Sequence, residues 1–351
     1  MSKKLISMLV VLSTVAVLFT GCLASNKTPE PAKPAVVAPV TQTNKKVIKI
    51  SMGVNEQHPS YLGGKKFAEI VNAKTNGRYE VQVYANAQLG DDIKATEAVK
   101  MGNLEMTAPS SSPLVGIDPD LNVLDLPFLF PNTKAADAVL DGAVGTKIAL
   151  KLEDNGLKLL AYYENGFRNI TNSVREIKVP ADLKGLKIRT MENKIHLAAF
   201  KAMGANPTPM PFSEVFTAMQ QKTIDGQENP TPTIFLSKYN EVQKYATLTG
   251  HVYGPHLLLI NKKLYDSMTP EDQKIFGDAA AESKIFQRET NRAMTKDYVA
   301  KLREAGMTVT ELTDEQKKVF QDACAPVYKQ FEATIGKDLI AEVKAVIEAN
   351  K

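Results

Sequence analysis

The stretch that decides the fold is residues 47–84, VIKISMGVNEQHPSYLGGKKFAEIVNAKTNGRYEVQVY. The alternation of apolar residues in Val47–Val54 predicts a strand with one buried face. Residues 61–76 follow with apolar side chains at helical spacing, and Gly77 is a helix stop signal. Residues 79–84 then predict a second strand. A strand, a helix and a second strand in this order favour an α/β fold in which helices cover a sheet.

The same alternation continues along the chain. We expect further helices over 91–101, 133–155, 194–203 and 212–221, and strands over 104–108, 157–163, 186–190 and, with a turn, 223–226. This rhythm predicts a mostly parallel sheet flanked by helices, built as two such units. The chain has 351 residues, of which 44% are hydrophobic and 23% charged. This length suits two domains, and the composition is that of a globular protein.

One predicted helix is much longer than the others. The segment Thr269–Ala305 begins with Thr-Pro-Glu-Asp, a helix entry signal, and is followed by Gly306, a stop signal. An unbroken helix of this length spans about 55 Å at 1.5 Å per residue. Because that exceeds one small domain, we expect the helix to lie across both units. A later helical run, 320–331, contains Cys324, which we interpret as a small buried thiol.

The N-terminus has the pattern of a secretory signal. Lys3 and Lys4 precede the uncharged run Leu5–Phe19. That run is too short for a typical membrane span, which needs about 20 apolar residues. It is typical of the apolar core of a signal peptide. We therefore expect residues 1–21 to be removed and the mature protein to lie outside the cytoplasm.

The end of that signal, Leu18–Cys22 (LFTGC), resembles a bacterial lipobox, in which Cys22 is lipidated and becomes the first residue. The alternative is an ordinary signal cut near Ala24, with Cys22 discarded. The following segment contains four prolines and almost no apolar periodicity. Such a stretch cannot bury enough surface to offset its ordering entropy. Residues 22–46 therefore read as a lipidated cysteine and a proline-rich tether.

Sequence motifs for catalysis, cofactors and metals are missing. The sequence contains no Walker-type phosphate loop, no G-x-G-x-x-G after a strand, no HExxH and no G-x-S-x-G. Its two cysteines, Cys22 and Cys324, are too few and too far apart for a disulfide framework or a cysteine-rich metal site. The net charge of +4 is small for a nucleic-acid binder. We therefore expect no catalytic residues, no metal, no cofactor and no nucleic-acid partner.

Three polar residues stand at the ends of predicted strands. Arg168 lies just beyond the 157–163 strand, Arg189 ends the 186–190 strand, and Asn229 follows 223–226. In open α/β sheets, ligands bind beyond the carboxyl ends of the strands. Guanidinium groups match a carboxylate with planar, bidentate donors, and an asparagine amide can hold an oxygen. The alternative is that both arginines form surface ion pairs and that the Asn-Pro pair is a turn.

Several runs resemble a known family, the solute-binding proteins of TRAP (tripartite ATP-independent periplasmic) transporters, and within it the dicarboxylate-binding-type subgroup. The central run is 182–189, DLKGLKIR. Further matching runs occur in the same order as in the family, and the resemblance extends from Val47 to the C-terminus. They are FAE at 67–69, QLG at 88–90, LPF at 126–128, GANPTPMPFSE at 204–214, DGQENP at 225–230 and EVQKY at 241–245.

The resemblance implies a fold like that of periplasmic binding proteins. This is an α/β fold of two domains with a ligand cleft between them, crossed by hinge segments and by a long helix in the C-terminal half. The first domain would comprise residues 47–166 with about 255–293. The second would comprise residues 167–254 with about 294–351.

The resemblance also implies a binding site. The family's carboxylate-binding arginine falls on Arg189, its second arginine on Arg168 and its amide on Asn229. Phe212 would pack on the body of the ligand.

Three weaker candidates are His58, Ser110 and Glu192. His58 lies on the first strand-to-helix loop, within reach of a second carboxylate or a hydroxyl, or else in solvent. Ser110 takes the place of a glutamate in sialic-acid-binding members. Glu192 faces the cleft or caps the next helix.

The function that this resemblance implies is capture of an organic acid and its delivery to the membrane subunits of a TRAP transporter. A C4-dicarboxylate and a sugar acid such as a uronate are both compatible ligands. We expect a monomer without enzymatic activity, anchored by its lipid in the periplasm or on the outer face of the cytoplasmic membrane. Two alternatives remain open: a ligand-binding lipoprotein that acts in sensing, and an extracytoplasmic α/β enzyme.

Overall fold

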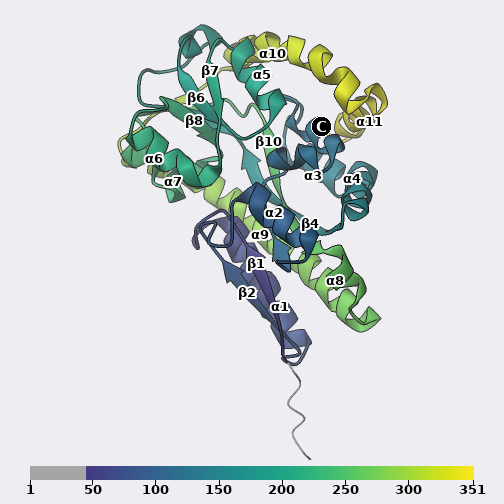
Figure 1. Cartoon of the computed structure of the whole chain (residues 1–351). Helices are drawn as coiled ribbons and strands as arrows, with labels where there is room; N and C mark the ends of the chain where they lie inside the picture. The colour runs from purple at the N-terminus through teal and green to yellow at the C-terminus, as the bar shows by residue number, and fades with distance from the viewer. Residues whose placement is uncertain (1–44) are drawn as a thin grey trace, which may run out of the picture. The chain divides into compact units, whose positions relative to one another are not determined.

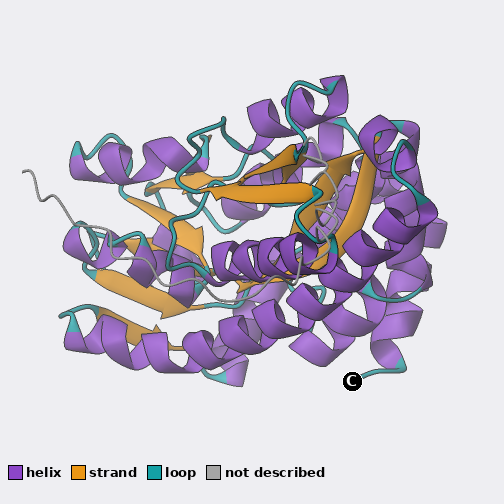
Figure 2. Ribbon diagram, turned by 90° about the horizontal axis from the view of Figure 1, so that it is seen from below, coloured by secondary structure: helices purple, strands orange, loops and turns teal. Residues whose placement is uncertain are grey.

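The structure is a computed structural model that describes residues 45–351. The predicted signal peptide, the predicted lipidation at Cys22 and all but the last two residues of the tether lie outside the described residues. The described part contains two β-sheets with helices on both sides of the strands (Figures 1 and 2). Within it, none of the helices is both long and apolar enough to span a membrane.

The first sheet has five strands in the order β2-β1-β3-β10-β4. They are β1 (Lys46–Ser51), β2 (Tyr79–Tyr84), β3 (Met106–Thr107), β4 (Leu157–Phe167) and β10 (Tyr253–Asn261). The second sheet has six strands in the order β11-β9-β5-β8-β6-β7. They are β5 (Asn169–Asn172), β6 (Lys187–Thr190), β7 (Asn206–Pro209), β8 (Gly226–Asn229), β9 (Tyr245–Leu248) and β11 (Thr308–Glu311).

Both sheets are mixed, which corrects the prediction of a mostly parallel sheet. The chain passes from the first sheet to the second between β4 and β5, through Arg168, and returns between β9 and β10. These two crossings run in opposite directions and are hydrogen-bonded to each other, because Arg168 N donates to Val252 O (2.8 Å) and His251 N donates to Arg168 O (3.2 Å). As a result β10 is antiparallel to β4, and β5 is antiparallel to β9.

Eleven α-helices occur in the described residues. They are α1 (Pro59–Lys74), α2 (Asp92–Met101), α3 (Thr133–Leu140), α4 (Ala143–Asp154), α5 (Lys194–Ala202), α6 (Val215–Gln220), α7 (Thr231–Leu236), α8 (Lys262–Asp266), α9 (Pro270–Glu304), α10 (Asp314–Ile335) and α11 (Lys337–Glu348). The predicted helix over 133–155 is in fact two helices. The break lies at Asp141 and Gly142, and Gly142 has an extended backbone at the start of α4.

Helix α9 is the predicted long helix, and it is unbroken over 35 residues. Thr269 caps its start by accepting a hydrogen bond from Asp272 N (3.1 Å). Its N-terminal half packs on the first sheet's core, where the rings of Phe67 and Phe276 lie 5.7 Å apart. Further along, Leu302 belongs to the core under the second sheet. The helix therefore contacts elements of both sheets, as its length predicts (Figure 1).

The strand predicted over 223–226 begins only at Gly226. The strand there is β8, Gly226–Asn229, with the sequence GQEN, and all four residues are buried. It pairs with β5 on one side and β6 on the other. Because β8 has no apolar side chain, hydrophobic periodicity does not reveal it. Burial of a polar strand between two others puts its side chains in the interior, where each requires a partner.

Strand β8 also sets a steric constraint. A Cβ atom on Gly226 would lie 2.1 Å from the backbone oxygen of Thr171 in β5. We expect Gly226→Ala to lower the free energy of unfolding by about 3 kcal/mol or more, because two paired strands must move apart. Gly277→Ala is the matched control, since no atom outside its own helix lies within 4 Å of the added methyl group. That control should be neutral or stabilise α9 by up to about 1 kcal/mol. Urea unfolding measures both, and a Gly226→Ala protein as stable as the control contradicts this account.

Candidate functional site

A cavity lies between the two sheets, at the ends of β4, β6, β8 and β10. It encloses about 550 Å³ of space, its mouth included. Six of the seven predicted ligand-binding residues line it. They are Ser110, Arg168, Arg189, Glu192, Phe212 and Asn229. The structure thus brings together at one cavity side chains from segments that are far apart along the chain.

Arg189 lines the cavity and forms no direct ion pair with a carboxylate among residues 45–351. The side chain belongs to β6 and is 1% exposed. Its Nε and Nη2 atoms both donate to Met210 O, at 2.9 and 2.6 Å. Its Nη1 atom is buried and has no hydrogen-bond partner within residues 45–351. Burial lowers the pKa of Arg189, partly opposed by Glu228. A buried charged donor without a partner is costly, so this atom marks a place for an anion.

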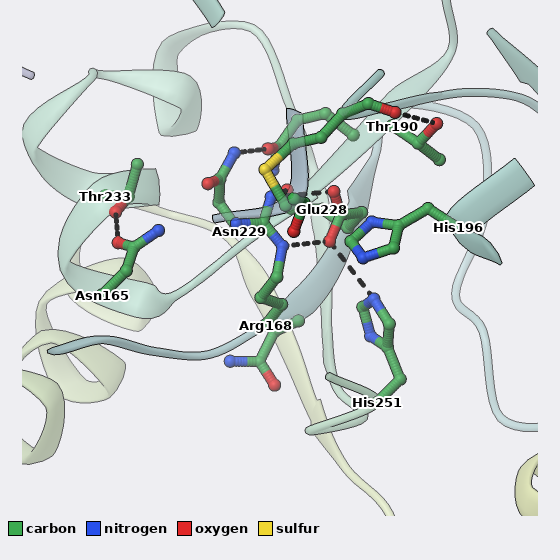
Figure 3. A network of polar contacts seen from close by, with 12 residues as sticks. Asn165, Arg168, Thr190, His196, Glu228, Asn229, Thr233 and His251 are labelled. Atoms are coloured by element: carbon green, nitrogen blue, oxygen red, sulfur yellow. Dashed lines mark hydrogen bonds and ion pairs between the residues drawn. The ribbon is translucent and has the colours of Figure 1, made fainter. Parts of the chain in front are cut away.

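Arg168 is also buried, but it already has a counter-charge. Its Nη2 atom donates to Glu228 Oε1 (2.8 Å) and to Glu228 O (2.6 Å), and its Nε atom donates to Glu228 Oε2 (Figure 3). Burial favours the neutral carboxyl of Glu228, but Arg168 and the hydrogen bond from His251 outweigh it and hold the pKa of Glu228 well below its usual range. The ion pair leaves only Nη1 of Arg168 without a protein partner among the described residues.

Glu228 is the counter-charge of Arg168, a role that the sequence analysis does not assign to it. It lies next to Asn229 in the DGQENP run, and only Asn229 was singled out. Strand alternation is the signal that could have found it, because Glu228 and Asn229 point to opposite faces of β8. Asn229 lines the cavity and donates through Nδ2 to Gln227 Oε1 (2.6 Å). This hydrogen bond orients the Asn229 amide through its nitrogen, and the Oδ1 atom takes no part in it.

The cavity wall also carries carboxyl groups. Asp92 is the first residue of α2, and its Oδ2 atom accepts from Ser110 N (3.1 Å). Burial raises the pKa of Asp92 to about 6, although the Ser110 hydrogen bond and Arg189 act to lower it. Burial also raises the pKa of Glu192, against the pull of Arg189. The sequence shows acids in the first turn of α2, where they suit the helix dipole, and nothing local indicates that Asp92 enters a cavity.

The remaining candidates take different positions. Phe212 packs near Tyr239, with ring centroids 6.3 Å apart, and presents part of its ring to the cavity. His58 is the one candidate that does not line the cavity. It is 1% exposed and caps α1 by accepting from Ser60 N. In addition, Asn165 and His256 line the wall, although no local sequence pattern indicates a role for them. Within residues 45–351, no group of three His, Cys, Asp or Glu side chains is placed to hold a metal ion.

The buried ion pair makes a prediction about stability. Removing the charge in Glu228→Gln leaves Arg168 buried without its counter-charge, which typically costs about 3–5 kcal/mol. The folded-state pKa of Glu228 is depressed, so its contribution is complete above about pH 4.5 and is lost as the pH falls below that value. We therefore expect the gap in unfolding free energy between wild type and variant to be large at pH 7 and to shrink toward pH 3.

The matched control is Glu311→Gln, which removes an exposed ion pair with Arg303. Exposed pairs contribute less than about 1 kcal/mol, so this gap should be small at every pH. Urea unfolding between pH 7 and pH 3 gives both gaps. Equal, pH-independent gaps for the two variants would show that the Arg168–Glu228 pair is not a special contributor.

Comparison with known proteins gives a consistent picture. The family model for bacterial extracellular solute-binding proteins, family 7, matches residues 50–334. The chain is 41% identical over 263 residues to the 2,3-diketo-L-gulonate-binding periplasmic protein YiaO of Escherichia coli strain K12, covering 75% of this chain and 80% of YiaO.

Two solved structures are also similar. The sugar acid binding protein DctPAm of Advenella mimigardefordensis, in complex with galactonate, has a TM-score of 0.86 and 39% identity, covering 88% of this chain and 99% of DctPAm. A TRAP periplasmic solute-binding protein of Sulfurospirillum deleyianum with bound succinate has a TM-score of 0.83 and 35% identity, covering 86% of this chain and 99% of that protein. These matches confirm the family and the two-domain fold expected from the sequence.

Proposed function

Because the chain belongs to family 7 of the bacterial extracellular solute-binding proteins, we propose that it captures a sugar acid and delivers it to the membrane subunits of a TRAP transporter. The family consists of extracytoplasmic transport proteins and not of enzymes, which sets the enzyme alternative aside. The observation that carries the proposal is the buried Nη1 atom of Arg189, which has no partner among the described residues and lies in a cavity wall that also holds carboxyl groups.

The first half of the proposal concerns the acid group. The ligand's carboxylate would take Nη1 of Arg189 as its main partner. Nη1 of Arg168 and the amide of Asn229 would hold its second oxygen. A carboxylate between guanidinium groups forms charge-assisted hydrogen bonds, which are roughly twice as strong as neutral ones. Glu228 is the counter-charge of Arg168, so Arg189 is the guanidinium that would take the ligand's carboxylate.

The second half concerns the rest of the ligand. Asp92 and Glu192 line the same cavity, and both have pKa values raised by burial. A second carboxylate near them would be repelled, since like charges a few ångströms apart in a partly buried site cost several kcal/mol. Hydroxyl groups would instead donate to these carboxylates. We therefore favour a polyhydroxy monocarboxylate over a C4-dicarboxylate.

The relatives are compatible with this choice. YiaO is named for 2,3-diketo-L-gulonate, and DctPAm holds galactonate, both sugar acids. The succinate-bound protein is less similar in sequence than these two. The carboxyl groups of Asp92 and Glu192 favour the same choice, because ligand hydroxyls can donate to them.

Capture would involve closure of two domains on the ligand. We propose that residues 47–166 with 255–293 form one domain and 167–254 with 294–351 the other. Elements of the two sheets meet beside the cavity, where Asn55 Nδ2 donates to Leu236 O in α7 (2.7 Å). In an open form, water can solvate Arg189. Closure removes that water, so an anion that replaces it shifts the equilibrium toward the closed form.

The N-terminal segment completes the proposal. Lipidation of Cys22 would anchor the protein, and residues 22–46 would act as the tether. The anchor would keep the binding protein close to its membrane subunits. We expect the protein itself to be a monomer.

The arginine assignment can be tested directly. We expect Arg189→Ala to abolish binding of sugar acids, because the carboxylate loses its charged partner, and Arg189→Lys to weaken it by loss of the planar donor geometry. A thermal-shift screen of the purified protein should include aldonates, uronates, C4-dicarboxylates and neutral sugars. A ligand at 100 times its dissociation constant stabilises by about 2.7 kcal/mol, which is several degrees. Shifts with neutral sugars only, or an unchanged shift in Arg189→Ala, contradict the proposal.

Asp92 gives a prediction about pH. Its pKa of about 6 means that it is mostly protonated at pH 5 and mostly ionised at pH 7. An ionised carboxylate is the stronger acceptor for ligand hydroxyls. We therefore expect the affinity for galactonate, measured by calorimetry, to rise between pH 5 and pH 7. In Asp92→Asn this rise should be smaller. A rise of the same size in the variant would remove Asp92 from the hydroxyl-binding role.

A further inference from the structure

The first turn of α1 connects to the cavity wall through a chain of hydrogen bonds whose direction can be deduced. Ser60 N donates to His58 Nδ1 (3.1 Å). A backbone N–H can only donate, so Nδ1 carries no proton and the neutral ring bears its proton on Nε2. His58 Nε2 lies 3.0 Å from Thr233 Oγ1 in α7 and therefore donates to it.

The chain continues to Asn165 in β4. Thr233 Oγ1 accepts from His58, so its own proton goes to its other partner, Asn165 Oδ1, at 3.2 Å (Figure 3). This hydrogen bond fixes the orientation of the Asn165 amide, and the amide oxygen is the acceptor in it. Its Nδ2 group makes no hydrogen bond to another residue of the described chain. Because Asn165 lines the cavity, that group is a donor available to a ligand.

A second chain starts from the same serine. Ser60 Oγ lies 2.6 Å from His256 Nδ1 in β10. Ser60 is 1% exposed, and within residues 45–351 its hydroxyl has no other hydrogen-bond partner. The hydroxyl proton therefore goes to Nδ1, which leaves the proton of the neutral ring on Nε2. Nε2 is on the ring edge opposite Ser60, and the ring lines the cavity.

Both imidazoles are held neutral. Burial lowers the pKa of His256 to about 3, and the charge of Arg168 adds to this. Burial also lowers the pKa of His58 well below its ordinary value, with His256 contributing; the two rings lie 5.9 Å apart. At neutral pH the two chains therefore end in neutral donors, and neither adds charge to the site.

We propose that Ser60 fixes these two chains so that Asn165 Nδ2 and His256 Nε2 together bind an oxygen on the ligand carbon next to the carboxylate. This inference rests on the proposed function and narrows its ligand to 2-hydroxy or 2-keto acids. Asn165 lies three residues before Arg168 at the end of β4, and the charge of Arg168 acts on His256, so both donors lie near the arginines. The carboxylate is satisfied by the arginines, and neutral donors suit the neutral oxygen beside it.

The consequence is discrimination. An acid without an oxygen at this carbon would leave two buried donors unpaired in the closed form. Sites built to bond a ligand oxygen reject analogues that lack it more strongly than the gain from one hydrogen bond suggests. We expect the wild-type protein to bind a 2-hydroxy acid at least about tenfold more tightly than its 2-deoxy counterpart.

The experiment is calorimetry on the full-length purified protein with matched pairs of acids. The pairs are galactonate with 2-deoxygalactonate and erythronate with 3,4-dihydroxybutanoate. The measured quantity is the ratio of affinities within a pair, since a merely structural defect lowers both affinities and leaves the ratio unchanged. His256→Leu should bring the ratio toward one, and His256→Gln, whose amide nitrogen can replace Nε2, should restore part of it.

The first chain is tested in the same way. Thr233→Val removes the hydroxyl that orients Asn165 and should lower the ratio, whereas Thr233→Ser should retain it. Thr290→Val, which removes a hydroxyl bonded within α9, is the control for that change and should leave the ratio unaltered. Ser60→Ala keeps the backbone N–H that donates to His58 and removes only the hydroxyl that bonds to His256, so it should lower the ratio through the second chain alone. If it fails to fold, the Thr233 and His256 variants decide.

The outcomes separate the two levels of the proposal. Failure of the wild type to bind any of these acids overturns the proposed function and this inference with it. Equal affinities within each pair overturn the inference alone. A ratio that stays high in both His256→Leu and Thr233→Val also overturns it, because the discrimination then comes from other groups.

Discussion

The structure depends on one buried arginine that forms no direct ion pair within the described residues. Two guanidinium groups lie in the same cavity wall, and the chain treats them differently. Arg168 is paired with Glu228, which lies on the interior face of β8. The same carboxylate also contacts Nε2 of His251. Arg189 has only a backbone oxygen for two of its donors, and its third is without a protein partner among the described residues. A buried cation of this kind is tolerated in a protein that can open to water, and it becomes favourable when an anion is enclosed with it.

The framework that holds this wall comes from α9. Gln287 of that helix donates through Nε2 to Glu164 O and accepts at Oε1 from Glu164 N, both at 2.7 Å. The register of β4 and β10 shifts next to this clamp, between Gly254 and Pro255. The clamp therefore fixes the end of β4, from which Asn165 and Arg168 reach the cavity. Arg168 is also the residue through which the chain passes from the first sheet to the second. The connection between the sheets and the proposed ligand-binding wall thus depend on the same few residues.

Much of this could be predicted from the sequence. Apolar alternation predicts strands such as β1 and β2. The entry and stop signals at the two ends of α9 predict its length. The polar strand β8 was misplaced because its GQEN sequence has no apolar face, and the α3–α4 break was missed because Gly142 lies inside a continuous helical pattern. The position of both arginines at the ends of predicted strands, together with the family resemblance, predicts their place in the site. Asp92, Asn165 and His256 could not be found, because their role depends on which distant segment lies opposite them, and local patterns do not contain that information.

The cavity wall combines donors and acceptors that the separate residues do not reveal. Arg189 and His256 line the same cavity as the carboxyl groups of Asp92 and Glu192. Burial raises the pKa of both carboxyl groups, and the charge of Arg189 acts against this in each case. The acid group of a ligand would match the arginine, and its hydroxyl groups would donate to the carboxylates. A second acid group would be repelled by Asp92 and Glu192, and a neutral sugar would leave Arg189 without an anion. On the proposed function, selectivity for a sugar acid would therefore come from the charges around Arg189 and would need no close steric fit to one sugar.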